Sequence, residues 1–193
     1  TKAQATLDAM AAGYSVILGG VLADEGRKLW GEPHMLIKAS CVGTVVDLNP
    51  LPKAEQDDTY RVVQIHYKRL PIKKAGTTWL LRQTQALRFH HVDIAFLSHL
   101  LHPVPRSGFL MGRHTHIHTR CNAVFAEVPL QQPFPRLDSQ PTAMDLVRQG
   151  IQWVRDVHNG TDWGVDSDPR IQMGRPIAPP PVYSTASKRT CAP

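Results

Sequence analysis

The sequence has few cysteines, few aromatic residues and no long apolar run. Its 193 residues contain 3 Cys, a number too small and too odd for a disulfide framework, so we expect a reducing compartment or a virus particle. The longest apolar stretch, around residues 16–22, is interrupted by two glycines and is far shorter than the roughly 20 residues of a spanning helix, which predicts no membrane insertion. A hydrophobic content of 42% with 20% charged residues is typical of a globular chain with a real core.

Acidic residues are scarce in the middle of the chain. Residues 51–128 carry 11 Lys and Arg against 5 Asp and Glu, a net charge of +6 that equals the net charge of the whole protein. Asp93 is the only acidic residue between Asp58 and Glu127. Such a field attracts polyanions through phosphate contacts and counterion release. An acidic protein neighbour and a simply solvated basic surface are the two alternatives. The candidate polyanion-binding residues are Arg61, Lys68, Arg69, Lys73, Lys74, Arg82, Arg88, Arg113 and Arg120.

Apolar residues at helical spacing occur near both ends of the chain. A stripe from Leu7 to Val21, with members three and four residues apart, predicts a helix over residues 3–22. A second stripe follows Thr142 and Asp145, a pair typical of a helix start, and predicts a helix over residues 142–158.

Alternation of apolar and polar residues predicts strands between the two helices. The predicted fold is therefore α+β, with a mainly antiparallel sheet over about residues 37–128 packed against both helices. Residues 92–101 fit either a short helix or a buried strand. The predicted strands lie at residues 37–48, at residues 63–67, within residues 77–89, and as one or two strands within residues 109–128, with a loop at residues 51–58.

The end of the chain is rich in proline. Residues 162–193 contain 6 of the 16 prolines and few large apolar side chains, a composition typical of an extended segment. We therefore expect a single α+β domain over residues 1–160 and an extended arm over residues 161–193. Arms of this kind connect neighbouring subunits in large assemblies.

Histidine is concentrated in one part of the sequence, where 7 of the 10 histidines lie between His90 and His118. On a strand, His114, His116 and His118 would project from one face at intervals of about 6.6–7 Å. Neutral imidazoles at this spacing are candidate ligands for Zn or another divalent transition metal, although no third ligand is singled out by its spacing. The alternatives are partner-contacting surface histidines and hydrogen-bonded structural ones.

The segment His116-Ile117-His118, followed by Asn122, resembles the His-hydrophobic-His strand of metal-dependent nucleases and relaxases. The resemblance covers seven residues. Those enzymes attack DNA with a tyrosine, and no tyrosine of this chain has a matching sequence context, so no catalytic role is carried over.

These observations predict a non-enzymatic structural subunit of a large assembly, such as a virus particle or a nucleoprotein complex. The arm would contact neighbouring subunits of a homo- or hetero-oligomer, and the basic middle would face nucleic acid or an acidic surface. The alternative is a metal-dependent enzyme that acts on nucleic-acid phosphodiesters through the His-rich strand.

Overall fold

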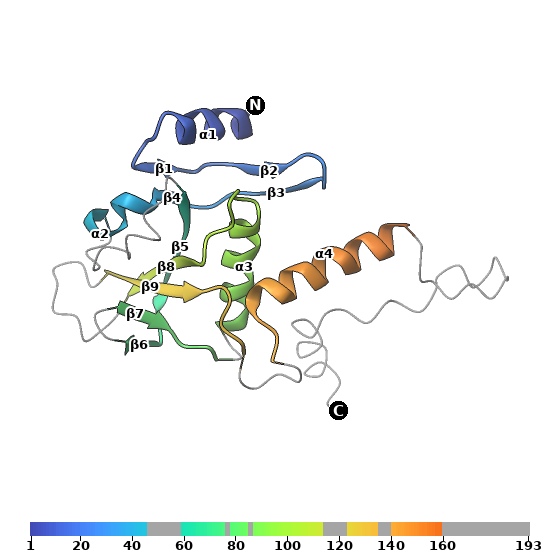
Figure 1. Ribbon diagram of the computed structural model, residues 1–193. Helices are drawn as coiled ribbons and strands as arrows, with labels where there is room; N and C mark the ends of the chain where they lie inside the picture. The colour runs from blue at the N-terminus through green and yellow to red at the C-terminus, as the bar shows by residue number, and fades with distance from the viewer. Residues whose placement is uncertain (46–58, 76–77, 85–86, 114–122, 135–139, 160–193) are drawn as a thin grey trace. The chain divides into compact units, whose positions relative to one another are not determined.

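A computed structural model describes residues 1–45, 59–75, 78–84, 87–113, 123–134 and 140–159 (Figure 1). The chain divides into two compact units, Thr1–Gln132 and Pro133–Pro193. The division falls inside the predicted single domain of residues 1–160. The predicted arm, residues 161–193, lies outside the described residues.

The first unit is built on a mixed sheet. Its described strands form seven members of one sheet, in the spatial order β1-β4-β5-β8-β9-β7-β6. Neighbours pair antiparallel except β5 with β8 and β7 with β9, which pair parallel. The predicted α+β class and mainly antiparallel sheet are therefore confirmed. The strands are β1 Val16–Leu18, β4 Met35–Lys38, β5 Tyr60–Arg69, β6 Ile72–Ala75, β7 Thr78–Leu81, β8 Ser107–Arg113 and β9 Ala123–Pro129.

Helices and a small ribbon complete this unit. A two-stranded ribbon, β2 Leu22–Asp24 with β3 Leu29–Gly31, lies outside the main sheet. Figure 1 shows α3 alongside the central strands and α1 near β1. The helices of the first unit are α1 Lys2–Ala11, α2 Val42–Val45, which continues a 3-10 turn at Ala39–Cys41, and α3 Arg88–His99.

The central strands are buried on both faces. On one face, Ile37, Val63 and Phe109 pack with Val42 of α2, and all four side chains are fully buried. The other face contacts α3 where Gly108 of β8 meets Ile94 and Ser98. A side chain at Gly108 would lie 2.5 Å from Ile94 Cγ2 and 3.0 Å from the Val62 carbonyl oxygen. The helix can approach β8 this closely because position 108 has no Cβ.

The predicted helix over residues 3–22 is wrong beyond Ala11. Gly13 adopts a φ of +75°, which ends the helical path, and Val16–Leu18 then pairs with β4 as an edge strand. The Tyr60 hydroxyl donates to the Tyr14 carbonyl oxygen over 2.7 Å and holds this turn against β5. The β-branched residues Val16 and Ile17 are better suited to a strand than to a helix.

The predicted strand at residues 37–48 is correct only at its start. Residues 37–38 belong to β4, whereas residues 39–45 are helical. Val42 and Val45 are three residues apart, so a short apolar run satisfies a helical turn as well as a strand. Residues 46–48 and the predicted loop at residues 51–58 lie outside the described residues.

The remaining sheet predictions are largely confirmed. The strand at residues 63–67 is the middle of β5, and residues 109–128 contain two strands, β8 and β9. The strand predicted within residues 77–89 is confined to β7, because Arg88 and Phe89 begin α3. Residues 92–101 prove helical as far as His99, with one buried stripe formed by His91, Ile94, Ala95 and Ser98.

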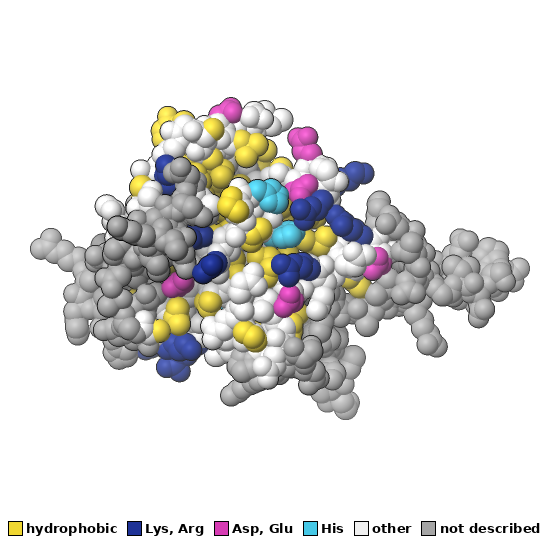
Figure 2. Space-filling model, viewed as in Figure 1, with side chains coloured by type: hydrophobic (Ala, Val, Ile, Leu, Met, Phe, Trp, Pro, Cys, Tyr) yellow, Lys and Arg dark blue, Asp and Glu magenta, His cyan; other side chains and the backbone are white. Residues whose placement is uncertain are grey.

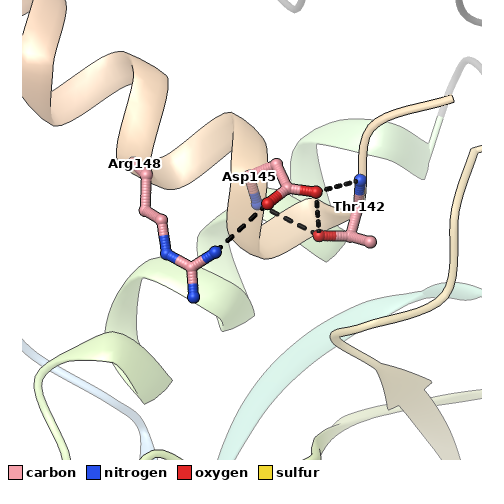
Figure 3. A network of polar contacts seen from close by, with 3 residues as sticks. All are labelled: Thr142, Asp145 and Arg148. Carbon is pink, nitrogen blue, oxygen red and sulfur yellow. Dashed lines mark hydrogen bonds and ion pairs between the residues drawn. The ribbon is translucent and has the colours of Figure 1, made fainter. Parts of the chain in front are cut away.

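The second unit contains α4, Ala143–Asn159, close to the predicted helix at residues 142–158. Thr142 and Asp145 form a reciprocal cap (Figure 3): the Thr142 N–H and hydroxyl both donate to Asp145 Oδ2, over 3.0 and 2.8 Å, and the Asp145 N–H donates to Thr142 Oγ1. The Thr142 N–H lowers the pKa of Asp145. The contribution of this carboxylate to stability is therefore present at neutral pH and is lost as the pH falls through the lowered pKa.

The apolar stripe of α4 is only partly buried. Met144 and Val147 are 1% and 4% exposed, whereas Val154, which the spacing places on the same stripe, is 57% exposed. The helix therefore passes from a buried start to an exposed end.

We predict that Gly108→Ala destabilises the first unit by about 1–3 kcal/mol, because the new methyl group would overlap Ile94 and the fixed Val62 carbonyl oxygen. Urea unfolding measures the effect. Gly26→Ala is the matched control, since its Cβ would meet only Asp24 Oδ1, at 3.5 Å. Equal unfolding midpoints for the two variants would show that α3 does not need the close approach.

Candidate functional site

Strand β5 runs from the core to the surface. Val62 and Val63 are fully buried, whereas Tyr67, near the other end of the strand, is 87% exposed. The register with β8 changes along this path, since β5 advances from Ile65 to Arg69 while β8 advances only from Met111 to Arg113. The register shift adds two residues to β5 relative to β8, and we call this irregularity the β5 bulge. Irregularities of the bulge kind redirect the strand and often lie beside functional sites. His66, Tyr67 and Lys68 have no register partners on β8.

A buried leucine fixes the strand again beyond the bulge. Leu70 is 2% exposed and packs directly on Gly112, where a Cβ would overlap its side chain. Its N–H donates to the Arg113 carbonyl oxygen over 2.9 Å. As a result, Arg69 and Arg113 are register partners on neighbouring parallel strands. Paired residues project to the same face, so the sheet holds two arginines side by side.

Three exposed cations mark this end of the sheet. We name Lys68, Arg69 and Arg113 the basic strand end; all three are exposed. Within the described part of the chain, no Asp or Glu forms an ion pair with any of them. Like charges on adjacent strand positions repel one another, and a bound anion removes that repulsion.

The other predicted polyanion-binding residues have varied positions. Lys73 is exposed on β6, an edge strand where lysine hinders pairing with another sheet. Arg82 is exposed, and its Nε donates to the Ile72 carbonyl oxygen over 3.2 Å, which links the ends of β6 and β7. The side chain of Lys74 and the whole of Arg120 lie outside the described residues.

Two of the predicted polyanion-binding residues are in the interior. Arg61 is 2% exposed and Arg88 is 7% exposed, so neither presents its guanidinium to a large partner. Arg61 lies in the register of β4 and β5 opposite Ile37, within the buried part of the sheet. Arg88 begins the buried stripe of α3. In this structure neither residue is part of the exposed positive surface, and their role in polyanion binding stays a prediction.

A polar cluster lies where β5 meets α3. Gln64 Nε2 donates to Asp93 Oδ2 over 3.0 Å, and Gln64 Oε1 accepts from the His34 backbone N–H over 3.2 Å and contacts His34 Nδ1. His66 follows Gln64 by two residues on the same face of β5. Its ring packs edge-to-face on the His90 ring, with 4.4 Å between the ring centroids. We name these five residues the polar cluster.

Burial shifts the pKa values of two members of the polar cluster, Asp93 and His90. It raises the pKa of Asp93, against the opposing effects of the Gln64 hydrogen bond and of His90 and His34. It lowers the pKa of His90, with smaller contributions from His66 and Lys68 in the same direction. His90 is therefore neutral at neutral pH. Lys68 of the basic strand end follows His66 of the polar cluster by two residues on β5.

The metal prediction concerns residues that the structure does not describe. His114, His116 and His118 lie outside the described residues, so a Zn site there remains a prediction. Elsewhere, in the described ranges, no three His, Cys, Asp or Glu side chains are grouped to hold a metal ion.

The polar cluster was not predicted from the sequence. The usable signal was the spacing of His90 and Asp93, which share one side of a helix at positions three apart. It becomes informative only once residues 88–99 are known to be helical. Asp93 stands out in the sequence as the only acidic residue between Asp58 and Glu127, and its hydrogen bond with Gln64 gives it a structural partner.

On the face shown in Figure 2, Lys and Arg side chains lie close to histidines.

Comparisons with protein-family models, with curated proteins and with solved structures find no match to this chain. Among the described residues, no helix is both long and apolar enough to cross a membrane.

We predict that Gln64→Leu raises the pKa of Asp93 further, because the variant removes a hydrogen bond that favours the carboxylate. An NMR pH titration of the Asp93 carboxyl carbon measures this directly. Stability should also fall more as the pH rises from the ordinary Asp range to the raised pKa, since the folded state retains a proton that the unfolded chain releases.

The control for this experiment is Gln83→Leu, which removes a glutamine whose Nε2 donates to the Gln132 carbonyl oxygen, away from Asp93. It should leave the Asp93 titration unchanged. A parental pKa in Gln64→Leu would show that the Gln64 hydrogen bond does not act on Asp93.

Proposed function

We propose that the protein is a non-enzymatic subunit of a large assembly, such as a virus particle or a nucleoprotein complex, and that it contacts a polyanion through the basic strand end. The observation that carries this proposal is the side-by-side position of Arg69 and Arg113, both exposed, beside Lys68. The Leu70 contact with Gly112 supports it, because a fixed strand end holds the cations together before a ligand binds.

The buried arginines narrow the proposed surface. With Arg61 and Arg88 buried, fewer cations of the basic middle are available to a partner than the sequence count indicates, and Lys68, Arg69 and Arg113 form one exposed group among those that remain. A localised group of cations favours repeated contacts with closely spaced anions, as on a phosphate backbone.

The test is binding of the full chain to heparin, a polyanion without bases, across a range of salt concentrations. Arg69→Ala combined with Arg113→Ala should weaken binding. It should also reduce the magnitude of the slope of log affinity against log salt concentration by roughly one to two, because the variant displaces fewer counterions from heparin on binding. The matched control is Lys2→Ala combined with Arg155→Ala, which removes the same charge from exposed positions elsewhere.

Heparin binding with a parental salt slope in the Arg69 and Arg113 variant would remove the basic strand end from the proposal. The same preparations also test the alternative function. Metal-dependent cleavage of an oligonucleotide that is lost on His116→Ala and His118→Ala would favour the phosphodiester-directed enzyme instead.

The assembly part of the proposal concerns the proline-rich arm, residues 161–193. Truncation after Gly160 should reduce the size of the assembly, measured by sedimentation velocity, because the arm is proposed to contact neighbouring subunits. A cooperative thermal unfolding transition like that of the full chain is the control for folding. An unchanged sedimentation profile would contradict the role of the arm.

A further inference from the structure

Tyr67 is the most exposed of the large apolar and aromatic side chains in the described residues, at 87%. A single exposed aromatic residue is ordinary on a protein surface. Tyr67 differs because it lies in the β5 bulge and directly precedes Lys68 and Arg69. Proteins that bind single-stranded nucleic acid combine an aromatic ring with cations. The bases stack on the ring, and the cations bind the phosphates.

The sheet register orders this surface into rows. Ile65, Met111 and Phe125 are register partners across β5, β8 and β9, and each is half-buried. In the next row of the same face, Arg69 pairs with Arg113. The face therefore changes from partly exposed apolar side chains to cations.

Tyr67 lies between the two rows. The preceding His66 packs on His90 of α3 at the opposite face, so alternation along β5 places Tyr67 on the face of Arg69. The bulge provides the extra chain length between Ile65 and Arg69, and therefore adds an aromatic side chain that a regular ladder would not hold there. Stacking area and positive charge are thus adjacent on one face.

We propose that this face binds single-stranded nucleic acid, with Tyr67 stacked on a base and Arg69 and Arg113 bound to the flanking phosphates. The inference rests on the proposed polyanion contact and adds the class of ligand. A duplex offers its bases no free face for Tyr67 to stack on. An acidic protein would use the cations without needing the aromatic ring.

An anionic membrane would also match a tyrosine among cations. However, Met111 and Phe125 of the apolar row pack against the hydrophobic core, so they do not supply the exposed apolar side chains that insertion into lipid needs. Single-stranded nucleic acid uses both the ring and the charge.

The experiment compares three probes by fluorescence anisotropy: a labelled oligothymidylate, an abasic deoxyribose-phosphate oligomer of equal length, and labelled heparin. Tyr67→Ala should weaken oligothymidylate binding roughly 5- to 100-fold, the range expected for one lost stacking contact. It should leave the abasic oligomer and heparin unaffected. Tyr67→Phe, which keeps the ring, should bind oligothymidylate like the parent.

Arg69→Ala combined with Arg113→Ala should weaken binding of all three probes. The high exposure of Tyr67 makes its substitution compatible with folding, and a parental urea unfolding curve for Tyr67→Ala verifies this. Exposed Tyr14 provides a matched aromatic control, since Tyr14→Ala should not change oligothymidylate binding.

The outcomes separate this inference from the proposed function. If the parent binds heparin but binds oligothymidylate no better than the abasic oligomer, the stacking site is refuted and the polyanion contact stands. If the parent binds none of the probes, both are refuted. Tyr67-dependent binding to phosphatidylserine vesicles without oligothymidylate binding would overturn the inference in favour of a lipid surface.

Discussion

The close contact between α3 and β8 at Gly108 determines the arrangement of the first unit. Ile94 occupies the space that a side chain at position 108 would fill, and the Val62 carbonyl of β5 borders the same space. This contact brings the helix near two parallel strands at once. It also places Asp93, the residue before Ile94, within hydrogen-bonding distance of Gln64 on β5. The polar cluster therefore follows from a packing contact in the core.

Strand β5 links this core to the surface. Its first residues are buried on both faces, its middle contributes Gln64 and His66 to the polar cluster, and its last residues are exposed. The bulge separates the two environments because it changes the register before the strand is fixed again at Leu70. The half-buried histidines His66 and His90 and the exposed cations Lys68 and Arg69 consequently have different environments, although His66 is only two residues from Lys68 on β5.

The parts of the fold that could be predicted from the sequence are those set by residues close together in the chain. The Thr142 and Asp145 cap uses residues three apart, and the alternation within β5 reflects its own pleat, so both were visible in short segments. The path of the chain after Ala11 depends on Gly13 and on pairing with a strand about twenty residues later, which no helical stripe reports. Residues 42–45 likewise became helical through packing of Val42 in the core.

The sequence predicts that the candidate site is rich in basic residues, but it does not predict which of these residues are exposed or adjacent. A count of charges identifies the basic middle, but burial of Arg61 and Arg88 depends on which face each position occupies. The pairing of Arg69 with Arg113 depends on a parallel register between distant segments. The contact of Gln64 with Asp93 required the helical assignment of α3. Each of these features depends on the tertiary structure, although the residue types involved can be read from the sequence.

The parallel pairing of β5 with β8 also constrains how the chain folds during synthesis. Val63 pairs with Phe109, and the intervening segment contains β6, β7 and α3. The centre of the sheet therefore cannot close until β8 has left the ribosome, and a large loop must be closed before its contacts form. Until that moment β5 has only β4 as a partner, with its other edge unpaired. Early folding of this unit thus depends on protection of a strand that later lies inside the sheet, next to the central strand β8.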